Sequence, residues 1–93
     1  MDHHPTLEHH RKFIDRIDRT IVALLTERMR LGLQLGDIKR QHQSPTRVLE
    51  REAAVLAMVR SAADGPLSPG SAQRIFAVII DETAALQDDA RAV

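Results

Sequence analysis

Cysteine is absent from this 93-residue sequence, and Phe13 and Phe76 are its only Phe, Tyr or Trp residues. Without cysteine the chain has no disulfide bonds, no thiolate metal ligands and no cysteine nucleophile. Thirteen basic residues balance thirteen acidic ones, and this balance argues against a nucleic-acid-binding protein. No apolar stretch approaches the length of a membrane span, and the segment 1–10 lacks the apolar core of a signal peptide. We therefore expect a cytoplasmic protein without nucleic-acid or membrane partners.

Several catalytic motifs are missing as well. The sequence has no Ser-His-Asp order typical of a hydrolase triad, no glycine-rich phosphate loop and no zinc-ligand spacing. Histidines cluster near the N-terminus, at His3, His4, His9 and His10, and we expect them to have only adventitious affinity for nickel. The sequence therefore predicts neither a bound metal ion nor a cofactor.

The first predicted helix covers residues 7–38, with Thr6 as its N-cap. Its inward positions follow one another in steps of three and four for about nine turns, close to a coiled-coil seam. These positions are Leu7, His10, Ile14, Ile17, Ile21, Leu24, Arg28, Leu31, Leu35 and Ile38. A turn is predicted at 41–45, because Pro45 disfavours a helical conformation of the residue before it.

Two shorter helices are predicted after this turn, over about 47–63 and from Pro69 onward. The segment 64–66 ends the second helix, with Gly65 as a left-handed cap. Ser68 is the expected N-cap of the third helix, whose end is expected to fray over 88–91. The inward faces are predicted to comprise Leu49, Leu56, Val59 and Ala63 in the second helix and Ala72, Ile75, Phe76, Ile79, Thr83 and Leu86 in the third. The fold class is thus all-α, one domain over 1–93 with an ordered core of about 7–87.

The length of the first helix predicts a dimer. About 32 residues span roughly 48 Å, whereas a compact domain of this size has a radius of gyration near ~12 Å. A symmetric homodimer that pairs two long helices would cover the rod, and a kink near Gly36 is the alternative. Gly32 and Gly36 lie four residues apart, and we expect another backbone to approach them closely.

Arg28 interrupts the apolar side of the first helix, where a cation needs an anionic partner. Either an ion pair with Glu52 or a bound anion would supply it. Lys39 lies at nearly the same angular position, about 16 Å further along the axis, so an apolar strip has a cation at each end. Glu52 is expected on the inward row of the second helix, where it can accept a hydrogen bond from an alcohol or pair with Arg28 or Lys39.

Three further polar residues belong to the candidate site. Thr83 and Gln87 lie one turn apart on the third helix, where they serve either a core hydrogen bond or a ligand. Arg11 is about 25 Å from Arg28 along the helix, so it is either a solvated residue or, in an antiparallel dimer, part of the other subunit's pocket. Nearly all these side chains carry positive charge or donate hydrogen bonds. Such a set suits a polyanionic substrate that is held and stabilised electrostatically.

The chain resembles the small helical chorismate mutases (type II) over about 7–87. The resemblance rests on RKFIDRIDRTIVALLTERM (11–29), LGDIK (35–39), SPTRVLERE (44–52) and IIDETAALQ (79–87). It implies an intertwined homodimeric helical bundle and a cofactor-independent isomerase of the shikimate pathway and aromatic amino acid biosynthesis. The implied reaction is the intramolecular Claisen rearrangement of chorismate, a small dianion, to prephenate.

The resemblance also implies roles for individual residues. Arg28 and the other subunit's Arg11 would bind the two substrate carboxylates, supported by Arg51. Lys39 would contact a carboxylate and the ether oxygen. The candidate catalytic residues are Lys39, Gln87, Arg28 and Glu52, and the candidate substrate-binding residues are Arg11, Arg28, Lys39, Val48, Arg51, Glu52, Thr83 and Gln87. In this scheme Gln87 donates to the ether oxygen, Glu52 accepts from the ring hydroxyl and Thr83 contacts a carboxylate.

Val48 departs from the family pattern, because many relatives have Asp at this position near the ring hydroxyl. A changed contact there makes 4-amino-4-deoxychorismate an alternative substrate. Two further candidate functions are an isochorismate-pyruvate lyase on the same fold and a non-catalytic helical dimerisation or regulatory module.

Overall fold

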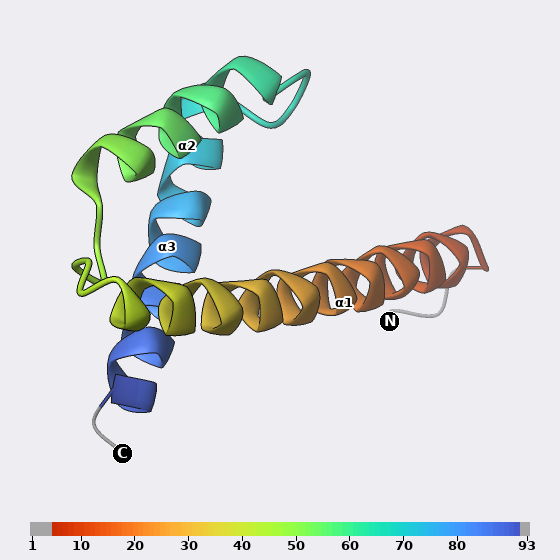
Figure 1. The fold of residues 1–93 in the computed structure, drawn as a ribbon. Helices are drawn as coiled ribbons and strands as arrows, with labels where there is room; N and C mark the ends of the chain where they lie inside the picture. The colour runs from red at the N-terminus through yellow and green to blue at the C-terminus, as the bar shows by residue number, and fades with distance from the viewer. Residues whose placement is uncertain (1–4, 92–93) are drawn as a thin grey trace. The chain divides into compact units, whose positions relative to one another are not determined.

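The computed structural model describes residues 5–91, which contain three helices: α1 (Pro5–Gln41), α2 (Leu49–Ala62) and α3 (Pro69–Arg91) (Figure 1). Every regular element within these residues is helical, which confirms the all-α prediction. No helix in the same range is long and apolar enough to cross a membrane. The chain divides into two units, Met1–Leu31 and Gly32–Val93. His3 and His4 lie outside the described residues.

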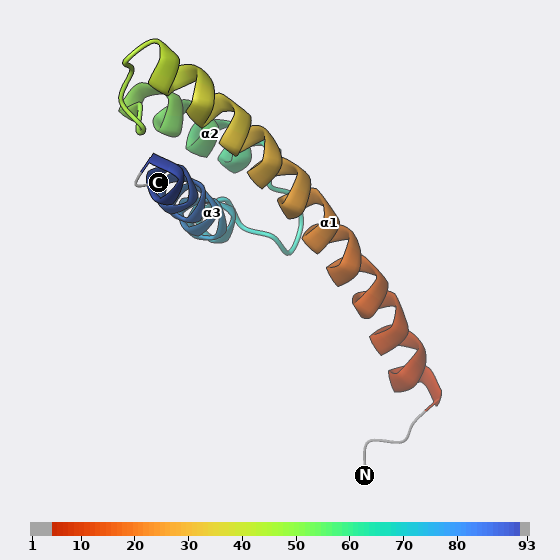
Figure 2. The ribbon, with the colours of Figure 1, turned by 60° about the horizontal axis from the view of Figure 1, so that its bottom comes forward.

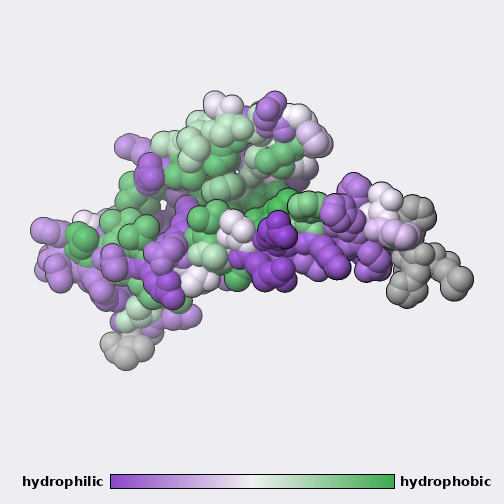
Figure 3. All heavy atoms as spheres, turned by 90° about the vertical axis from the view of Figure 1, so that its right-hand side faces the viewer, coloured by the Kyte–Doolittle hydropathy of each residue, from purple (hydrophilic) through white to green (hydrophobic). Residues whose placement is uncertain are grey.

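The first unit is a helical segment whose apolar side chains lie at the surface. The ring edge of His9 contacts Phe13 with 4.8 Å between centroids, and the guanidinium of Arg16 lies 5.4 Å from the Phe13 centroid. Between 47% and 65% of the surface remains exposed for each of Phe13, Ile14, Ile17, Ile21, Val22, Leu24 and Leu31. On the face of the molecule drawn in Figure 3, hydrophobic residues lie beside hydrophilic ones. The predicted apolar side of this helix therefore remains exposed among the residues that the structure describes.

In the second unit, α2 and α3 pack against each other (Figures 1 and 2). Val55 and Val59 of α2 are buried against Ala72 and Ile80 of α3. The same cluster is flanked by the half-buried side chains of Leu56, Ala63 and Phe76. This small apolar core fixes the relative position of the two helices that carry Glu52, Thr83 and Gln87.

The predicted inward faces are only partly correct. Val59 and Ala72 are buried, as expected, but Leu49 is 76% exposed and Ile75 is 53% exposed, so these two positions were wrong. α3 buries Ala72, Ile80, Ala84 and Gln87, and of these the predicted inward face contained only Ala72. The prediction therefore chose Ile75 where the structure buries Ile80, and it missed Ala84, whose small side chain permits close approach of a neighbouring helix.

The connection between α2 and α3 follows its local sequence. Gly65 has φ +58°, and the turn closes with a hydrogen bond of 3.2 Å from the Leu67 N–H to the Asp64 carbonyl. Gly65 is therefore left-handed, as predicted, but it lies in this turn, after the C-cap residue Ala63. The predicted N-cap of α3 is confirmed, because the Oγ of Ser68 accepts a hydrogen bond of 3.0 Å from the Ser71 N–H.

α1 extends beyond the predicted range 7–38 at both ends, and α2 is shorter than the predicted range of about 47–63. Thr6 lies inside α1, which includes Pro5, so it is not the residue before the helix. α3 continues to Arg91 and does not fray over 88–91. The Arg91 guanidinium donates to the Ser44 carbonyl at 2.8 Å, and this contact helps to hold the last turn in place.

Candidate active site

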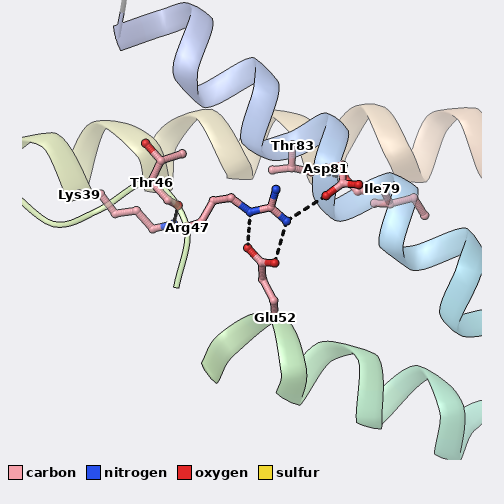
Figure 4. Close-up of polar contacts among 7 residues, drawn as sticks. All are labelled: Lys39, Thr46, Arg47, Glu52, Ile79, Asp81 and Thr83. Carbon is pink, nitrogen blue, oxygen red and sulfur yellow. Dashed lines mark hydrogen bonds and ion pairs between the residues drawn. The ribbon is translucent and has the colours of Figure 1, made fainter. Parts of the chain in front are cut away.

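The loop between α1 and α2 is held through Lys39 and Arg91. Lys39 Nζ donates to the Thr46 carbonyl at 2.8 Å (Figure 4), and the Lys39 carbonyl accepts from the Ser44 N–H at 2.7 Å. The break predicted before Pro45 is confirmed, because α1 ends at Gln41. An ammonium group has three N–H donors. Lys39 therefore has two N–H groups in addition to the one that binds the Thr46 carbonyl.

Arg47, in the same loop, binds carboxylates from two helices. Its Nε donates to Glu52 Oε2 at 2.8 Å, and its Nη2 donates to Glu52 Oε1 at 2.7 Å. The same Nη2 donates to Asp81 Oδ1 at 2.9 Å (Figure 4). The guanidinium thus joins the first turn of α2 to the middle of α3. Its planar fork matches the two oxygens of one carboxylate and restricts the orientation of Glu52.

Positive charge around Glu52 keeps it ionised. Hydrogen bonds from Arg47 lower the pKa of Glu52 most strongly; partial burial acts in the opposite direction, and the positive charges of Arg47 and Lys39 lower the pKa further. Hydrogen bonds to Glu52 and Asp81 raise the pKa of Arg47 above its ordinary value. Glu52 is therefore a carboxylate at neutral pH, and it can accept but not donate a hydrogen bond.

Gln87 is buried, with 4% of its surface exposed, and its Nε2 donates to the Gly32 carbonyl at 2.7 Å. The two glycines of α1 make room for α3 side chains. A Cβ at Gly32 would lie 2.8 Å from Thr83 Cγ2, and one at Gly36 would lie 3.1 Å from Gln87 Cγ. The predicted close approach is present, but side chains make it and not another backbone. One N–H of the Gln87 amide remains beyond the Gly32 bond.

The other predicted residues of the second unit lie on or before α2 and on α3. The Thr83 hydroxyl donates to the Ile79 carbonyl at 2.8 Å, within its own helix. Val48 precedes α2 in an extended conformation and is 39% exposed. Arg51 is exposed in the first turn of α2. Lys39 and Glu52 interact electrostatically, and Thr83 and Gln87 both lie beside Gly32.

The remaining two predicted residues belong to the first unit. Arg11 Nη1 lies 3.9 Å from Glu8 Oε1, and both side chains are about half exposed. Arg28 is half-buried. Within residues 5–91, the structure groups no three His, Cys, Asp or Glu side chains that could hold a metal ion.

Sequence reasoning missed two residues that contact the site. Arg47 stands five residues before Glu52 at the entry to α2, and this spacing was the only signal for it. Asp81 lies 34 residues after Arg47 and is 65% exposed. No periodicity distinguishes an exposed acidic residue of this kind, because its contact depends on how α3 packs against α2.

A sequence profile of the chorismate mutase type II family matches residues 10–88. The chain belongs to this family. The family is one of isomerases, and its fold agrees with the helices described above. A chorismate mutase (form II) structure from Thermus thermophilus has a TM-score of 0.87 at 28% identity, and the alignment covers 89% of this chain and 94% of that one.

Sequence relatives belong to the same group. A bifunctional chorismate mutase/prephenate dehydratase of Neisseria gonorrhoeae is 35% identical over 78 residues, which are 84% of this chain and 21% of the relative. The bifunctional enzyme of Aquifex aeolicus is 47% identical over 45 residues, 48% of this chain and 12% of that one. A 4-amino-4-deoxychorismate mutase of Streptomyces pristinaespiralis is 32% identical over 77 residues, 82% of this chain and 60% of the relative. The chain thus spans between 12% and 60% of the length of these relatives.

Proposed function

We propose that the chain is a chorismate mutase that converts chorismate to prephenate. The observation that carries the proposal is the family match over residues 10–88, which includes every position to which the resemblance assigns a role. The described geometry is consistent with the proposal. Lys39 and Gln87 lie near the C-terminal ends of α1 and α3 and supply hydrogen-bond donors, and Glu52 in the first turn of α2 supplies an ionised acceptor. The proposed reaction breaks a C–O bond as a C–C bond forms, so the protein need supply neither a nucleophile nor a proton.

Lys39 and Gln87 are the proposed donors to the ether oxygen, on which negative charge grows in the transition state. Each has an N–H group beyond its bond within the protein, to Thr46 and Gly32 respectively. Fixed donors at the site of developing charge stabilise a transition state more than mobile water does. Glu52, held ionised by Arg47, is the proposed acceptor for the ring hydroxyl.

Arg28, Arg51 and Arg11 are the proposed carboxylate-binding residues, and Thr83 is the proposed hydroxyl contact to a carboxylate. Arginine suits this role because its planar fork matches a carboxylate. Holding both carboxylates would select the compact conformer in which the two reacting carbons are close. No metal or cofactor takes part in this scheme, and we expect the enzyme to act in the cytoplasm.

A homodimer is part of the proposal. The exposed apolar side chains of residues 13–31 leave a long apolar surface uncovered. In a two-fold symmetric dimer, this surface of one subunit would pack against the same surface of the other. We propose that pairing covers this surface and brings Arg11 of each subunit to the other's site.

A direct assay tests the function. Purified protein is incubated with chorismate, its loss is followed by absorbance, and the product is identified by mass spectrometry. Prephenate as the main product supports the proposal, and absence of turnover contradicts it. The amino analogue is assayed in parallel, because Val48 departs from the family pattern and one relative is named for that substrate. A higher kcat/KM for the analogue would move the assignment to it.

Mixed dimers test the shared site. We expect Arg11→Ala and Arg28→Ala chains to be inactive alone and to recover partial activity after they are unfolded together and refolded. One site of each mixed dimer would then contain both arginines. The absence of any recovery, with mixed dimers verified by mass spectrometry, would contradict donation of Arg11 across the interface.

A further inference from the structure

Arg47 has no role in the proposed substrate contacts, yet it makes three hydrogen bonds to carboxylates. Two go to Glu52 at 2.7 and 2.8 Å and one goes to Asp81 at 2.9 Å (Figure 4). The three residues come from three segments of the chain: the loop, α2 and α3. A network that joins three segments at one guanidinium needs a physical reason.

Stability alone does not account for the network. The side chains of Arg47, Glu52 and Asp81 are 43%, 21% and 65% exposed, and ion pairs with this much contact with water contribute little to folding. What the arrangement controls is geometry. The bidentate pair fixes the plane of the Glu52 carboxylate. Asp81 accepts a hydrogen bond from the same Nη2 that binds Glu52, and this second bond restricts rotation of the guanidinium.

We propose that Arg47 is a positioning residue that orients Glu52 toward the substrate, with Asp81 as the anchor that holds Arg47. This inference rests on the proposed function, in which Glu52 accepts a hydrogen bond from the ring hydroxyl. A carboxylate has about four lone-pair sites, and Arg47 occupies one on each oxygen. The remaining sites point away from Arg47 in the plane of the carboxylate, and one of them receives the hydroxyl.

The charges around Glu52 give the proposal a second readout. Arg47 from the loop and Lys39 from α1 are the cations that act on Glu52, and Asp81 from α3 acts through Arg47. Removal of Arg47 leaves Lys39 as the cation that still favours the ionised form. Protonation of Glu52 would then occur at higher pH, and a protonated carboxyl group offers the hydroxyl a poorer acceptor.

The test compares Arg47→Gln and Arg47→Lys with Arg60→Gln as a matched control. Arg60 also joins α2 to α3, through a 2.8 Å hydrogen bond from Nη1 to Gln73 Oε1, but it has no contact with Glu52. We expect Arg47→Gln to lower kcat/KM for chorismate by roughly 10- to 100-fold, the scale of a misplaced catalytic group. Arg47→Lys keeps the charge without the fork and should lose less, and Arg60→Gln should retain wild-type kcat/KM.

Two measurements separate orientation of Glu52 from a general structural effect. The acidic limb of the kcat/KM–pH profile reports groups of the free enzyme and should move to higher pH in Arg47→Gln. In a Glu52→Gln background, Arg47→Gln should cause little further loss, because both changes remove the same interaction. Equal losses in both backgrounds, or an unshifted limb with wild-type kcat/KM, would overturn the proposal.

Carbon-13 NMR of the Glu52 side chain provides a readout without substrate. Arg47→Gln should raise the titration midpoint of the Glu52 carboxyl group, and an unchanged midpoint would contradict the proposed action of Arg47 on Glu52. Failure of the proposed function is recognised separately, as absence of turnover in the wild-type enzyme. Failure of the positioning role is recognised as an active wild type beside an unaffected Arg47→Gln variant.

Discussion

Replacement of Gly32 by alanine would place a methyl group against α3. The new Cβ would lie 2.8 Å from Thr83 Cγ2, about 1 Å inside the optimal separation of two carbon atoms. Relief requires Thr83 to move or the helices to separate, and separation would stretch the hydrogen bond from Gln87 to the Gly32 carbonyl. Overpacking costs ~1–3 kcal/mol, a lost buried hydrogen bond costs ~1–3 kcal/mol, and alanine regains about 1 kcal/mol of helix propensity.

We therefore expect Gly32→Ala to lower the free energy of unfolding by about 1–5 kcal/mol, measured by urea denaturation at one fixed protein concentration. Thr83→Ser removes the methyl group that clashes and keeps the hydroxyl. The double variant Gly32→Ala/Thr83→Ser should recover most of the loss, with a coupling energy of about 1 kcal/mol or more.

Gly70→Ala is the control for this cycle. A Cβ at Gly70 would meet Arg74 Nη1 at 3.4 Å, an ordinary contact with a flexible side chain. This variant should be neutral or slightly stabilised, because alanine has the higher helix propensity. If the effects of Gly32→Ala and Thr83→Ser add within about 0.5 kcal/mol, the two residues do not clash and the reasoning is wrong.

Three further predictions concern α3, Glu52 and Lys39. Ser68→Ala removes the cap of the Ser71 N–H and should cost ~0.5–2 kcal/mol in thermal unfolding; no loss would show that another group replaces the cap. In the folded protein Arg47 lowers the pKa of Glu52. The ionised Glu52 therefore contributes its full stabilisation of the fold above the pKa of an unperturbed Glu, about 4.3. This contribution is lost as the pH falls through the lower pKa that Glu52 has in the folded state. Urea titrations should therefore show the stability advantage of wild type over Glu52→Gln shrinking at acidic pH, and a constant difference would contradict this. Lys39→Ala should leave the proposed dimer intact, as measured by light scattering, and should reduce turnover by orders of magnitude. Near-normal turnover would remove Lys39 from the mechanism.

The three helices could be predicted because their signals are local. A period of three to four residues marks each helix, and Ser68 and Pro69 mark the start of α3 by chemistry that acts over a single turn. The buried faces of the helices were predicted less accurately than the helices themselves. Ile75 was expected to face the core but is 53% exposed, whereas Ile80 and Ala84, which were not expected there, are buried. The packing partner of α3 decides which of its apolar side chains are covered, and local periodicity does not specify that partner.

The candidate site was only partly predictable for a similar reason. Lys39, Glu52 and Gln87 could be singled out, because polar side chains at inward positions need partners. Their partners are Thr46, Arg47 and the Gly32 carbonyl. These contacts depend on the loop conformation and on how α3 packs against the part of α1 that belongs to the second unit. A periodicity identifies a face of a helix, but it does not specify which atom of another segment meets it.

The core described above contains no large side chain with less than 2% exposure among the described residues, and the apolar side chains of α1 remain at the surface. Covering that surface with a second copy would make folding and association a single equilibrium, in which stability depends on protein concentration. The melting temperature would then rise with concentration, and dilution would unfold the chain as it separates the subunits. For such a protein, the cellular concentration of the chain is itself a determinant of how much of it is folded.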